Sequence, residues 1–437
     1  MRPDLRGTLL IFGAGFIGEH VAKRAVQSGY SVLGTTRRRE RERELSKRGV
    51  MQPLLFRGAE PLDSDLIATH LSGVTHVLST VPPSGGADPV LAQHRDLLEQ
   101  QLPSLKWVGH ISTAAVYGAQ DAIDAASVPR PSSYSERVRM LIEREWAALS
   151  LPPTSDPVRI FRPASVYGPG RGPTQTLRRW SAAAIEKPGF VSSRVHVEDV
   201  AGAVLASMDQ SLGIFAADAG APDASEGGAM ADVDIAGDGC PVEGAGCSTY
   251  LLADNEPAAP ADVLRYTAEL YGLPTPEPVP YEGVEAELSA EARVFWSRPV
   301  RASAANAYAS LGVQLAYPTY REGLRAVKAV EGISIESPPA PPPSEAPPAA
   351  AKPKAPKKQT AKQPAAPLDD DQIAEMRRQV TARGFDDEKD WTVMDLKFYL
   401  KAFKLKVGGK KRELIERLSE YMGSTAPPDG GDGQVPF

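Results

Sequence analysis

The sequence predicts an α/β protein: a Rossmann-type, doubly wound parallel sheet with a small substrate-side lobe, followed by a C-terminal helix-extended-helix module. Two observations predict the sheet. Short apolar runs alternate with helix-like segments from residue 8 to about 330, and a glycine-rich turn follows the first run. Such alternation is typical of parallel strands covered by helices on both faces. A third observation, cations between two amphipathic segments near the end of the chain, predicts the module.

The chain of 437 residues divides into four parts by composition. Residues 7–330 are predicted to form the α/β domain, interrupted at about 209–248 by a Gly-, Ala- and Asp-rich insertion with too little apolar surface to order itself. Residues 331–368 form a Pro/Ala/Lys-rich linker, which we expect to be extended and semi-rigid. Residues 369–423 form the helical module, and residues 424–437 form a flexible tail.

Composition excludes several classes of protein. No apolar run is long enough for a membrane span, and the first apolar stretch is too early and too rich in glycine for a signal peptide. We therefore expect a soluble, intracellular protein with no membrane partner and no metal. The two cysteines, Cys240 and Cys247, cannot build a disulfide framework. We interpret them as free thiols in a loop, with a redox pair as the alternative.

The strands of the predicted sheet are short apolar runs that turn residues or helix-like segments separate. They comprise residues 8–15, 31–37, 75–81, 107–113 and 158–168.

A glycine-rich turn, GAGFIG, joins the first predicted strand to the first predicted helix. A dinucleotide diphosphate needs a tight turn, a backbone without Cβ at its closest approach and close helix packing, which explains Gly13, Gly15 and Gly18. Phe16 and Ile17 begin the helix and complete this part of the predicted cofactor site. The alternative is a purely structural turn.

The second strand ends without the acidic residue that would bind a ribose 2′-hydroxyl. Thr35, Thr36, Arg37 and Arg38 stand there instead. Hydroxyl and guanidinium groups suit a 2′-phosphate, because arginine is permanently charged and can hold two phosphate oxygens. The sequence therefore favours NADP over NAD. The alternative is that the arginines up to Arg43 only open a solvated helix.

Five motifs in order resemble the extended short-chain dehydrogenase/reductase (SDR) superfamily, in particular an atypical branch of the NAD-dependent epimerase/dehydratase type. The motifs are GAGFIG at 13–18, ISTAAVYG at 111–118, FRPASVYGPG at 161–170, RVHVEDVAGAVLASM at 194–208 and TYLLADNEPAAPADVLRYTAELYG at 249–272. The resemblance covers residues 8 to about 330 apart from the insertion. It implies an NAD(P)-binding fold of the reductase or epimerase kind.

The resemblance also assigns roles to individual residues. It implies that Thr113 hydrogen-bonds the substrate carbonyl and that the segment from Arg162 to Tyr167 lies beside the nicotinamide. His196 and Asp199 would shape the return to the sheet, and for His196 we favour a buried structural role. By the same resemblance, residues 79–91 form a loop near the adenine or phosphate side of the cofactor, and residues 317–324 belong to a closing helix.

The catalytic pair of the family is altered. Active members use a tyrosine and a lysine four residues later, so that the cation lies on the same helix face and lowers the pKa of the phenol. Here Tyr134 is followed at that spacing by Val138. Alignment on the downstream helix places Arg139 in the lysine position and Ser135 in the tyrosine position. Arg139 can bind the cofactor ribose, but it cannot give up a proton in a relay. We keep a catalytic hypothesis for Thr113, Tyr134 and Arg139.

The C-terminal module has apolar residues at helical spacing on both sides of a Gly-Gly pair. Cations gather where the second helix begins, and because they oppose the helix dipole, an external anion explains them better than local stability. TVMDLKFYL at 392–400 and GGKKRELIERL at 408–418 resemble a SAP domain, which implies binding to DNA or RNA. The predicted contacts are Lys404, Lys406, Lys410, Lys411 and Arg412. The alternative is a solvated face of a protein-interaction helix pair.

Three functions remain open. The first is an NADP-binding, atypical SDR-like protein with degenerate or altered catalytic residues, tethered to nucleic acid by its tail. The second is an active NADP-dependent reductase or epimerase/dehydratase acting on a sugar nucleotide or small carbonyl substrate. The third is a protein-interaction scaffold with an empty cofactor cleft. A DNA-binding tail would place the protein in the nucleus or an organelle nucleoid; otherwise we expect it in the cytoplasm.

Overall fold

The computed structural model describes residues 6–48, 51–178, 184–214 and 247–332, together with residues 396, 400, 403, 405, 406 and 410–424. The chain divides into two compact units, Met1–Pro342 and Pro343–Phe437, and each is described by itself. Across these described segments, no helix combines the length and the hydropathy needed to cross a bilayer.

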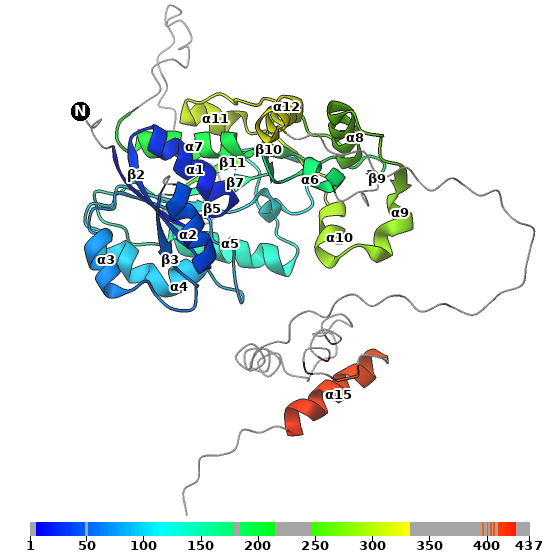
Figure 1. The fold of residues 1–437 in the computed structure, drawn as a ribbon, viewed down its shortest axis with the longest axis horizontal. Helices are drawn as coiled ribbons and strands as arrows, with labels where there is room; N and C mark the ends of the chain where they lie inside the picture. The colour runs from blue at the N-terminus through cyan, green and yellow to red at the C-terminus, as the bar shows by residue number, and fades with distance from the viewer. Residues whose placement is uncertain are drawn as a thin grey trace, which may run out of the picture. The chain divides into compact units, whose positions relative to one another are not determined.

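Seven parallel strands form the central sheet of the first unit, in the order β11-β7-β5-β4-β1-β2-β3 (Figure 1). These strands are β1 (Gly7–Phe12), β2 (Tyr30–Thr36), β3 (Gln52–Leu55), β4 (His76–Ser79), β5 (Trp107–Ile111), β7 (Arg159–Pro163) and β11 (Ser248–Leu252). The strand order reverses direction between β1 and β4. Ligands of open α/β sheets bind beyond the carboxyl ends of the strands at such a reversal. The predicted fold class is confirmed.

The strands bury both of their faces, as parallel strands between helical layers do. Along β1, Leu9 and Ile11 belong to one core cluster, whereas Leu10 and Phe12 belong to another. The first cluster packs against helices on one face of the sheet, and the second packs against helices on the opposite face (Figure 1). The first set contains α1 (Phe16–Gln27), α7 (Val197–Gln210) and α11 (Ala305–Leu311), and the second contains α4 (Pro89–Asp96) and α5 (Tyr134–Ala147).

The remaining elements connect the strands or build the smaller lobe. Between the strands lie α2 (Arg39–Arg48), α3 (Ser64–His70), the π-helix η1 (Leu97–Gln101) and the 3-10 helix η2 (Ala114–Tyr117). The helices of the lobe are α6 (Pro173–Arg178), α8 (Pro260–Tyr271), α9 (Tyr281–Val284), η3 (Glu285–Glu287), α10 (Ala290–Trp296) and α12 (Tyr320–Glu331). Three two-stranded sheets pair β8 (Ser165–Tyr167) with β10 (Arg194–His196), β9 (Ala184–Glu186) with β12 (Pro278–Pro280), and β6 (Ala122–Ile123) with β13 (Arg301–Ala302).

The predicted strands all form, with two differences. The segment 158–168 is not one strand: it is divided between β7 in the central sheet and β8, which pairs with β10 instead. The sequence reading also omitted the two edge strands, β3 and β11. The predicted closing segment 317–324 enters α12, whose first turn carries a capping box between Thr319 and Glu322.

The ends of the predicted insertion belong to regular structure. Residues 209 and 210 complete α7, and Ser248 begins β11. Residues 215–246 lie outside the described residues. Cys247 is buried against the core and is disulfide-bonded, so the interpretation of free thiols is wrong for this residue. Cys240 lies outside the described residues.

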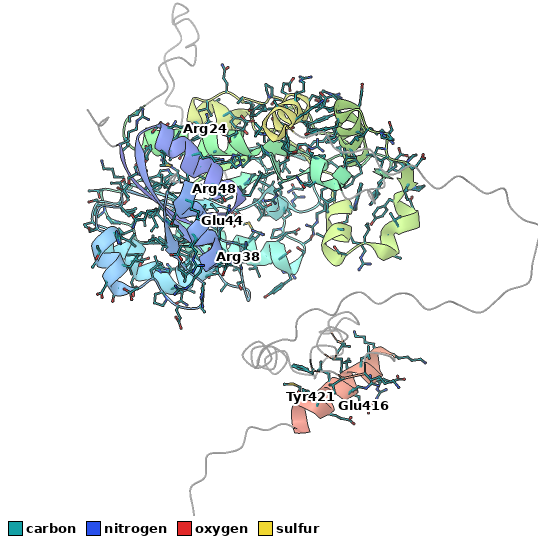
Figure 2. All side chains as sticks on the ribbon, viewed as in Figure 1. Arg24, Arg38, Glu44, Arg48, Glu416 and Tyr421 are labelled. Carbon is teal, nitrogen blue, oxygen red and sulfur yellow. The ribbon has the colours of Figure 1, made fainter. Side chains whose placement is uncertain are left out.

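In the second unit, α15 (Lys411–Ser424) packs against apolar residues that precede it. The rings of Phe403 and Tyr421 stack with their centroids 5.0 Å apart. Figure 2 shows Tyr421 and the exposed Glu416 on this helix. The buried cluster consists of Leu396, Leu400, Phe403, Leu414, Ile415 and Leu418. These residues have the helical spacing on which the prediction of the module was based. The linker beyond residue 332 and the tail beyond residue 424 lie outside the described residues.

Candidate functional site: a dinucleotide cleft at the start of α1

The glycine turn after β1 has the geometry that a diphosphate needs. Gly13 has a φ of +95°, which favours glycine, and its amide donates to Thr35 Oγ1 at 2.9 Å. Thr80 Oγ1, beyond the end of β4, donates to the Gly13 carbonyl at 2.7 Å. A Cβ on Gly18 would overlap that same carbonyl, so this glycine is needed for the helix to pack closely. The turn is thus held from both neighbouring strands.

The start of α1 is open toward a ligand. Gly15 is the residue before the helix, and no side chain in the described segments caps the helix amides. A Cβ built on Gly15 would meet no atom within 4 Å. Free amides of a first helical turn bind anions, and the helix dipole adds to the attraction. Gly15, Phe16 and Ile17 therefore fit a dinucleotide diphosphate.

A cavity of about 610 Å³ extends from this turn along the carboxyl ends of β1, β2 and β4. Such a volume suits a cofactor or other small ligand. The loop after β4 contributes one wall, including Thr80, Pro82 and Ser84, so the predicted loop 79–91 lies at the cavity. The segment after β3 contributes Phe56 and Arg57, which the sequence reading missed.

The charge of this cavity has one sign. Among the described residues, no carboxylate lines it and four arginines do: Arg37, Arg38, Arg41 and Arg57. Thr36 lies beside them at the end of β2, whereas Thr35 is buried under Gly13. Arg41 forms ion pairs with Glu19 and Glu44. For the other three arginines, the described part of the chain offers no hydrogen bond or ion pair within reach.

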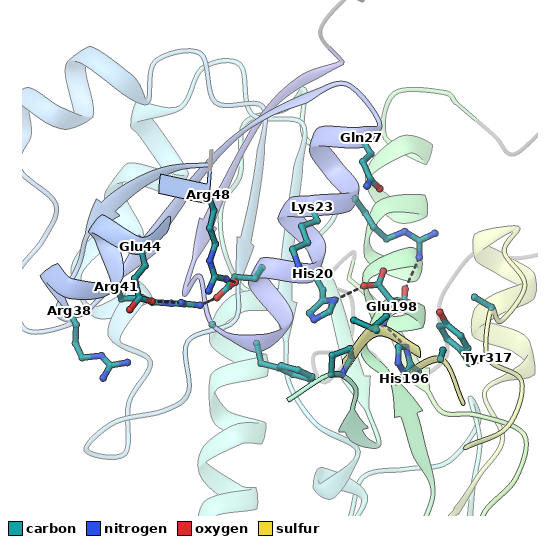
Figure 3. A pocket seen from close by; sticks show the side chains of 18 residues that line it. His20, Lys23, Gln27, Arg38, Arg41, Glu44, Arg48, His196, Glu198 and Tyr317 are labelled. Atoms are coloured by element: carbon teal, nitrogen blue, oxygen red, sulfur yellow. Dashed lines mark hydrogen bonds and ion pairs between the residues drawn. The ribbon is translucent and has the colours of Figure 1, made fainter. Parts of the chain in front are cut away.

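A second, larger hollow of about 930 Å³ lies over the outer face of α1 and shares Gly15, Arg38 and Arg41 with the first. Figure 3 shows His20 and Lys23 on α1, with the side chains of α2 on one side and His196, Glu198 and Tyr317 on the other. His20 Nδ1 lies 2.5 Å from a Glu198 oxygen, which ties α1 to α7. Figure 2 marks Arg24, Arg38, Glu44 and Arg48 over the same region.

The three catalytic candidates are not joined by hydrogen bonds within the described residues. Thr113 Oγ1 accepts from the Ala115 amide at 3.2 Å and so caps η2. Tyr134 is 69% exposed at the first position of α5. A Cβ on Gly86 would lie 2.8 Å from the Tyr134 hydroxyl, so this tyrosine rests on the loop that follows β4. The phenol therefore lies beside the cleft-lining loop, and no described residue forms a hydrogen bond with it that would activate it.

Helix α5 places the position four residues after Tyr134 in the core. Val138 is buried with the apolar cluster under the sheet, where a lysine would lose its solvation. Arg139 is half-buried, and burial lowers the pKa of its guanidinium although Glu143 raises it. It lines neither of the two cavities beside α1. The predicted contact between Arg139 and the cofactor ribose therefore stays a prediction.

Arg162 has a different role from the predicted one. Its side chain has no exposed surface, and its guanidinium binds Glu143 with nitrogen-oxygen distances of 2.6 to 3.2 Å. It also donates to the Tyr117 hydroxyl at 3.0 Å, and Ser112 Oγ donates to Glu143 at 2.5 Å. Because this arginine is buried and paired with Glu143, we correct its assignment from cofactor binding to the support of β5 and η2, which flank Thr113.

His196 and Asp199 support the start of α7. His196 is buried and its Nδ1 accepts from the Glu198 amide at 3.2 Å, while burial lowers the pKa of the imidazole to about 4. Asp199 accepts from the amides of Ala316 and Tyr317, and burial raises its pKa to about 6. The buried position of His196 agrees with the structural role that we favoured for it from the sequence.

The cations of the second unit lie at the beginning of α15. Lys406, Lys410 and Arg412 are exposed and Lys411 is half-exposed, whereas Lys404 lies outside the described residues. Arg417 donates to the Lys406 carbonyl at 2.7 Å, which fixes the chain just before the helix. These residues are therefore accessible, and their role in nucleic acid binding stays a prediction.

Residues 9–214 match the NAD dependent epimerase/dehydratase family. The chain is also 35% identical to a functionally unknown conserved protein from Silicibacter pomeroyi DSS. That solved structure matches with a TM-score of 0.59, over 74% of this chain and 99% of the other. The chain therefore belongs to the NAD dependent epimerase/dehydratase family and has its NAD(P)-binding, SDR-like fold.

Two further solved structures share this fold at low identity. Human epimerase family protein SDR39U1 (isoform 2), solved with NADPH, is 14% identical over 74% of this chain and 99% of its own, with a TM-score of 0.52. UDP-glucuronic acid 4-epimerase from Bacillus cereus, solved with NAD, is 16% identical with the same coverage and a TM-score of 0.50. No curated protein matches the chain significantly. The matched family range ends before the C-terminal module, so its resemblance to a SAP domain stays a prediction.

Proposed function

We propose that the protein binds NADP in preference to NAD at the start of α1. The observation that carries this proposal is the charge of the cleft, whose described lining contains four arginines and no carboxylate. A carboxylate would be needed to accept from the ribose 2′-hydroxyl of NAD and would repel the 2′-phosphate of NADP. Because similar structures hold NADPH in one case and NAD in another, the preference rests on the residues of this chain.

Arg37 is the residue that best tests this preference. It follows β2 directly, lines the cavity and has no acidic partner within the described residues. We expect Arg37→Asp to weaken NADPH binding by roughly 10- to 100-fold, because a charge-assisted hydrogen bond is replaced by repulsion. NADH affinity should stay unchanged or rise, because the new carboxylate can accept a hydrogen bond from the ribose 2′-hydroxyl. Arg43→Asp, an exposed change on α2 outside the cavity, is the matched control. Equal losses for both cofactors in titration calorimetry would refute the assignment.

We further propose that the usual tyrosine-lysine proton relay is lost or altered. Val138 in the core and the absence of an activating partner for Tyr134 within the described residues support this. The alternative is an active NADP-dependent reductase or epimerase/dehydratase acting on a sugar nucleotide or small carbonyl compound. The position of Tyr134 supports that alternative, because its hydroxyl lies against the loop after β4, which lines the proposed cofactor cavity.

Turnover separates these two possibilities. NADPH oxidation and sugar-nucleotide conversion are measured over a panel of substrates for the wild type and for Tyr134→Phe, with equal cofactor affinity as the control. If the relay is altered, any activity found will be the same in both proteins. A loss of activity confined to Tyr134→Phe would identify the phenol as the proton donor and support the enzyme.

For the C-terminal unit we propose binding to DNA or RNA. Its support is the accessible cations Lys406, Lys410 and Arg412 around the start of α15, where the helix dipole disfavours them. If about five phosphates are contacted, log affinity for duplex DNA falls with log salt at a slope near −4.5. Lys410→Gln should reduce the slope by about 0.9, and Lys47→Gln on α2 should not. Equal slopes in filter-binding assays of the full chain would count against the proposal.

A further inference from the structure

Arg171 belongs to a rigid loop that follows β8, next to the start of α1. Gly168 and Arg171 exchange backbone hydrogen bonds of 3.0 and 2.9 Å, which closes a tight turn. Gly170 has a φ of +79°, and its amide donates to Glu331 at the end of α12 at 2.8 Å. The loop is thus fixed at its base and at its tip, so the position of Arg171 is set before any ligand arrives.

The guanidinium of Arg171 lies over the ring of Phe16, with its carbon 5.2 Å from the ring centroid. Gly168 permits this contact, because a Cβ there would lie 3.2 Å from the Phe16 ring. The Arg171 side chain is exposed and finds no hydrogen bond or ion pair in the part of the chain that the structure describes. Stacking on an aromatic face holds a guanidinium in place while leaving its N–H groups free to donate.

Phe16 is also the first residue of α1, whose opening amides have no side-chain cap. The stacked cation therefore lies beside the helix end at which a diphosphate would bind, and Gly15 leaves open space there. We infer that Arg171 is a cofactor-binding residue that donates to the diphosphate of the bound dinucleotide from the side of the smaller lobe. This inference rests on the proposed binding of a nicotinamide dinucleotide.

The diphosphate assignment separates Arg171 from the arginines at the end of β2. Both NADPH and NADH carry the diphosphate, whereas only NADPH carries the 2′-phosphate. A residue that binds the diphosphate must therefore affect both cofactors equally. Arg37, in contrast, is proposed to bind the 2′-phosphate, so its replacement should weaken NADPH and not NADH. Because arginine offers a planar pair of donors and lysine a single charged group, lysine at this position should substitute only in part.

Titration calorimetry with NADPH and with NADH tests the inference in the full-length protein. We expect Arg171→Gln to weaken both cofactors by about 10- to 100-fold and by the same factor. Arg171→Lys should lose less, and Arg144→Gln, an exposed change on α5, should match the wild type. Thermal unfolding without cofactor should give the same midpoint for all three variants, since none alters a buried contact.

The outcomes distinguish this inference from the function on which it depends. If the wild type binds both dinucleotides and Arg171→Gln binds them equally well, the role of Arg171 is refuted while the proposed function stands. A loss confined to NADPH would move Arg171 to the 2′-phosphate and overturn the diphosphate assignment. If the wild type binds neither dinucleotide, the proposed function fails and the role of Arg171 fails with it.

Discussion

The buried ion pair between Glu143 and Arg162 gives a quantitative test of how the site is supported. Both side chains have no exposed surface, and the guanidinium makes three contacts to the carboxylate between 2.6 and 3.2 Å. Glu143→Gln keeps the shape of the side chain but removes its charge. Arg162 would then be a buried cation without a counterion, since Tyr117 provides only a hydroxyl.

Removal of one partner of a buried pair costs about 3–5 kcal/mol, because the remaining charge is left desolvated. We therefore expect the free energy of unfolding of Glu143→Gln to fall by about that amount in cofactor-free protein. Urea unfolding followed by circular dichroism measures the change. Glu145→Gln, an exposed substitution on the same helix, should stay within about 0.5 kcal/mol of the wild type.

The double variant Glu143→Gln/Arg162→Met isolates the pair. It removes the buried cation together with its counterion, so it should be less destabilised than Glu143→Gln alone. A loss below about 1 kcal/mol for Glu143→Gln would show that this pair does not support the end of β5 in the way we describe. A double variant as unstable as the sum of its two single variants would lead to the same conclusion.

Two further predictions concern stability. Burial raises the pKa of the Asp254 carboxyl from its ordinary value of 3.8 to about 7. The contribution of the protonated carboxyl to stability is therefore fully present below pH 3.8 and is lost as the pH rises to about 7. Relative to the wild type, Asp254→Asn should therefore gain stability as the pH rises from 4 to 8, by at most about 4 kcal/mol. If urea unfolding gave a difference in unfolding free energy between the two proteins that did not change with pH, the prediction would be contradicted. Gly18→Ala should lower stability by about 1–3 kcal/mol and weaken NADPH binding, because its Cβ would overlap the Gly13 carbonyl. If this variant had the stability and the NADPH affinity of the wild type, the turn would be able to relax around the new methyl group.

The parts of the site that depend on local sequence could be predicted, because the physical requirement lies within a few residues. Gly13 and Gly18 are examples: a left-handed turn and a close helix contact both call for glycine. The arginines after β2 could be found for the same reason. Likewise, the alternation of apolar runs with helix-like segments was enough to predict a parallel sheet, although it did not predict the short strand β3 or the strand β11.

The parts that depend on long-range pairing could not be predicted. Nothing near Arg162 in the sequence shows that Glu143, on the preceding helix, takes up its charge and removes it from the cofactor. The contact between Arg171 and Phe16 joins residues at two distant points of the chain. Similarly, Arg57 enters the cleft only because β3 lies beside β2, and that strand was missed.

The central claim is that a dinucleotide rests on the first turn of α1, and thermal unfolding with NADPH tests it most directly. At a hundred times its dissociation constant, NADPH should stabilise the wild type by about 2.7 kcal/mol. Gly15→Ala should lose this effect with little loss of stability, because its methyl group would meet no described atom within 4 Å but would enter the space proposed for the diphosphate. Gly73→Ala, whose methyl group would be equally uncrowded among the described residues, should keep the effect. Unfolding midpoints that move with neither NADPH nor NADH, or that move equally in Gly15→Ala and the wild type, would contradict the claim.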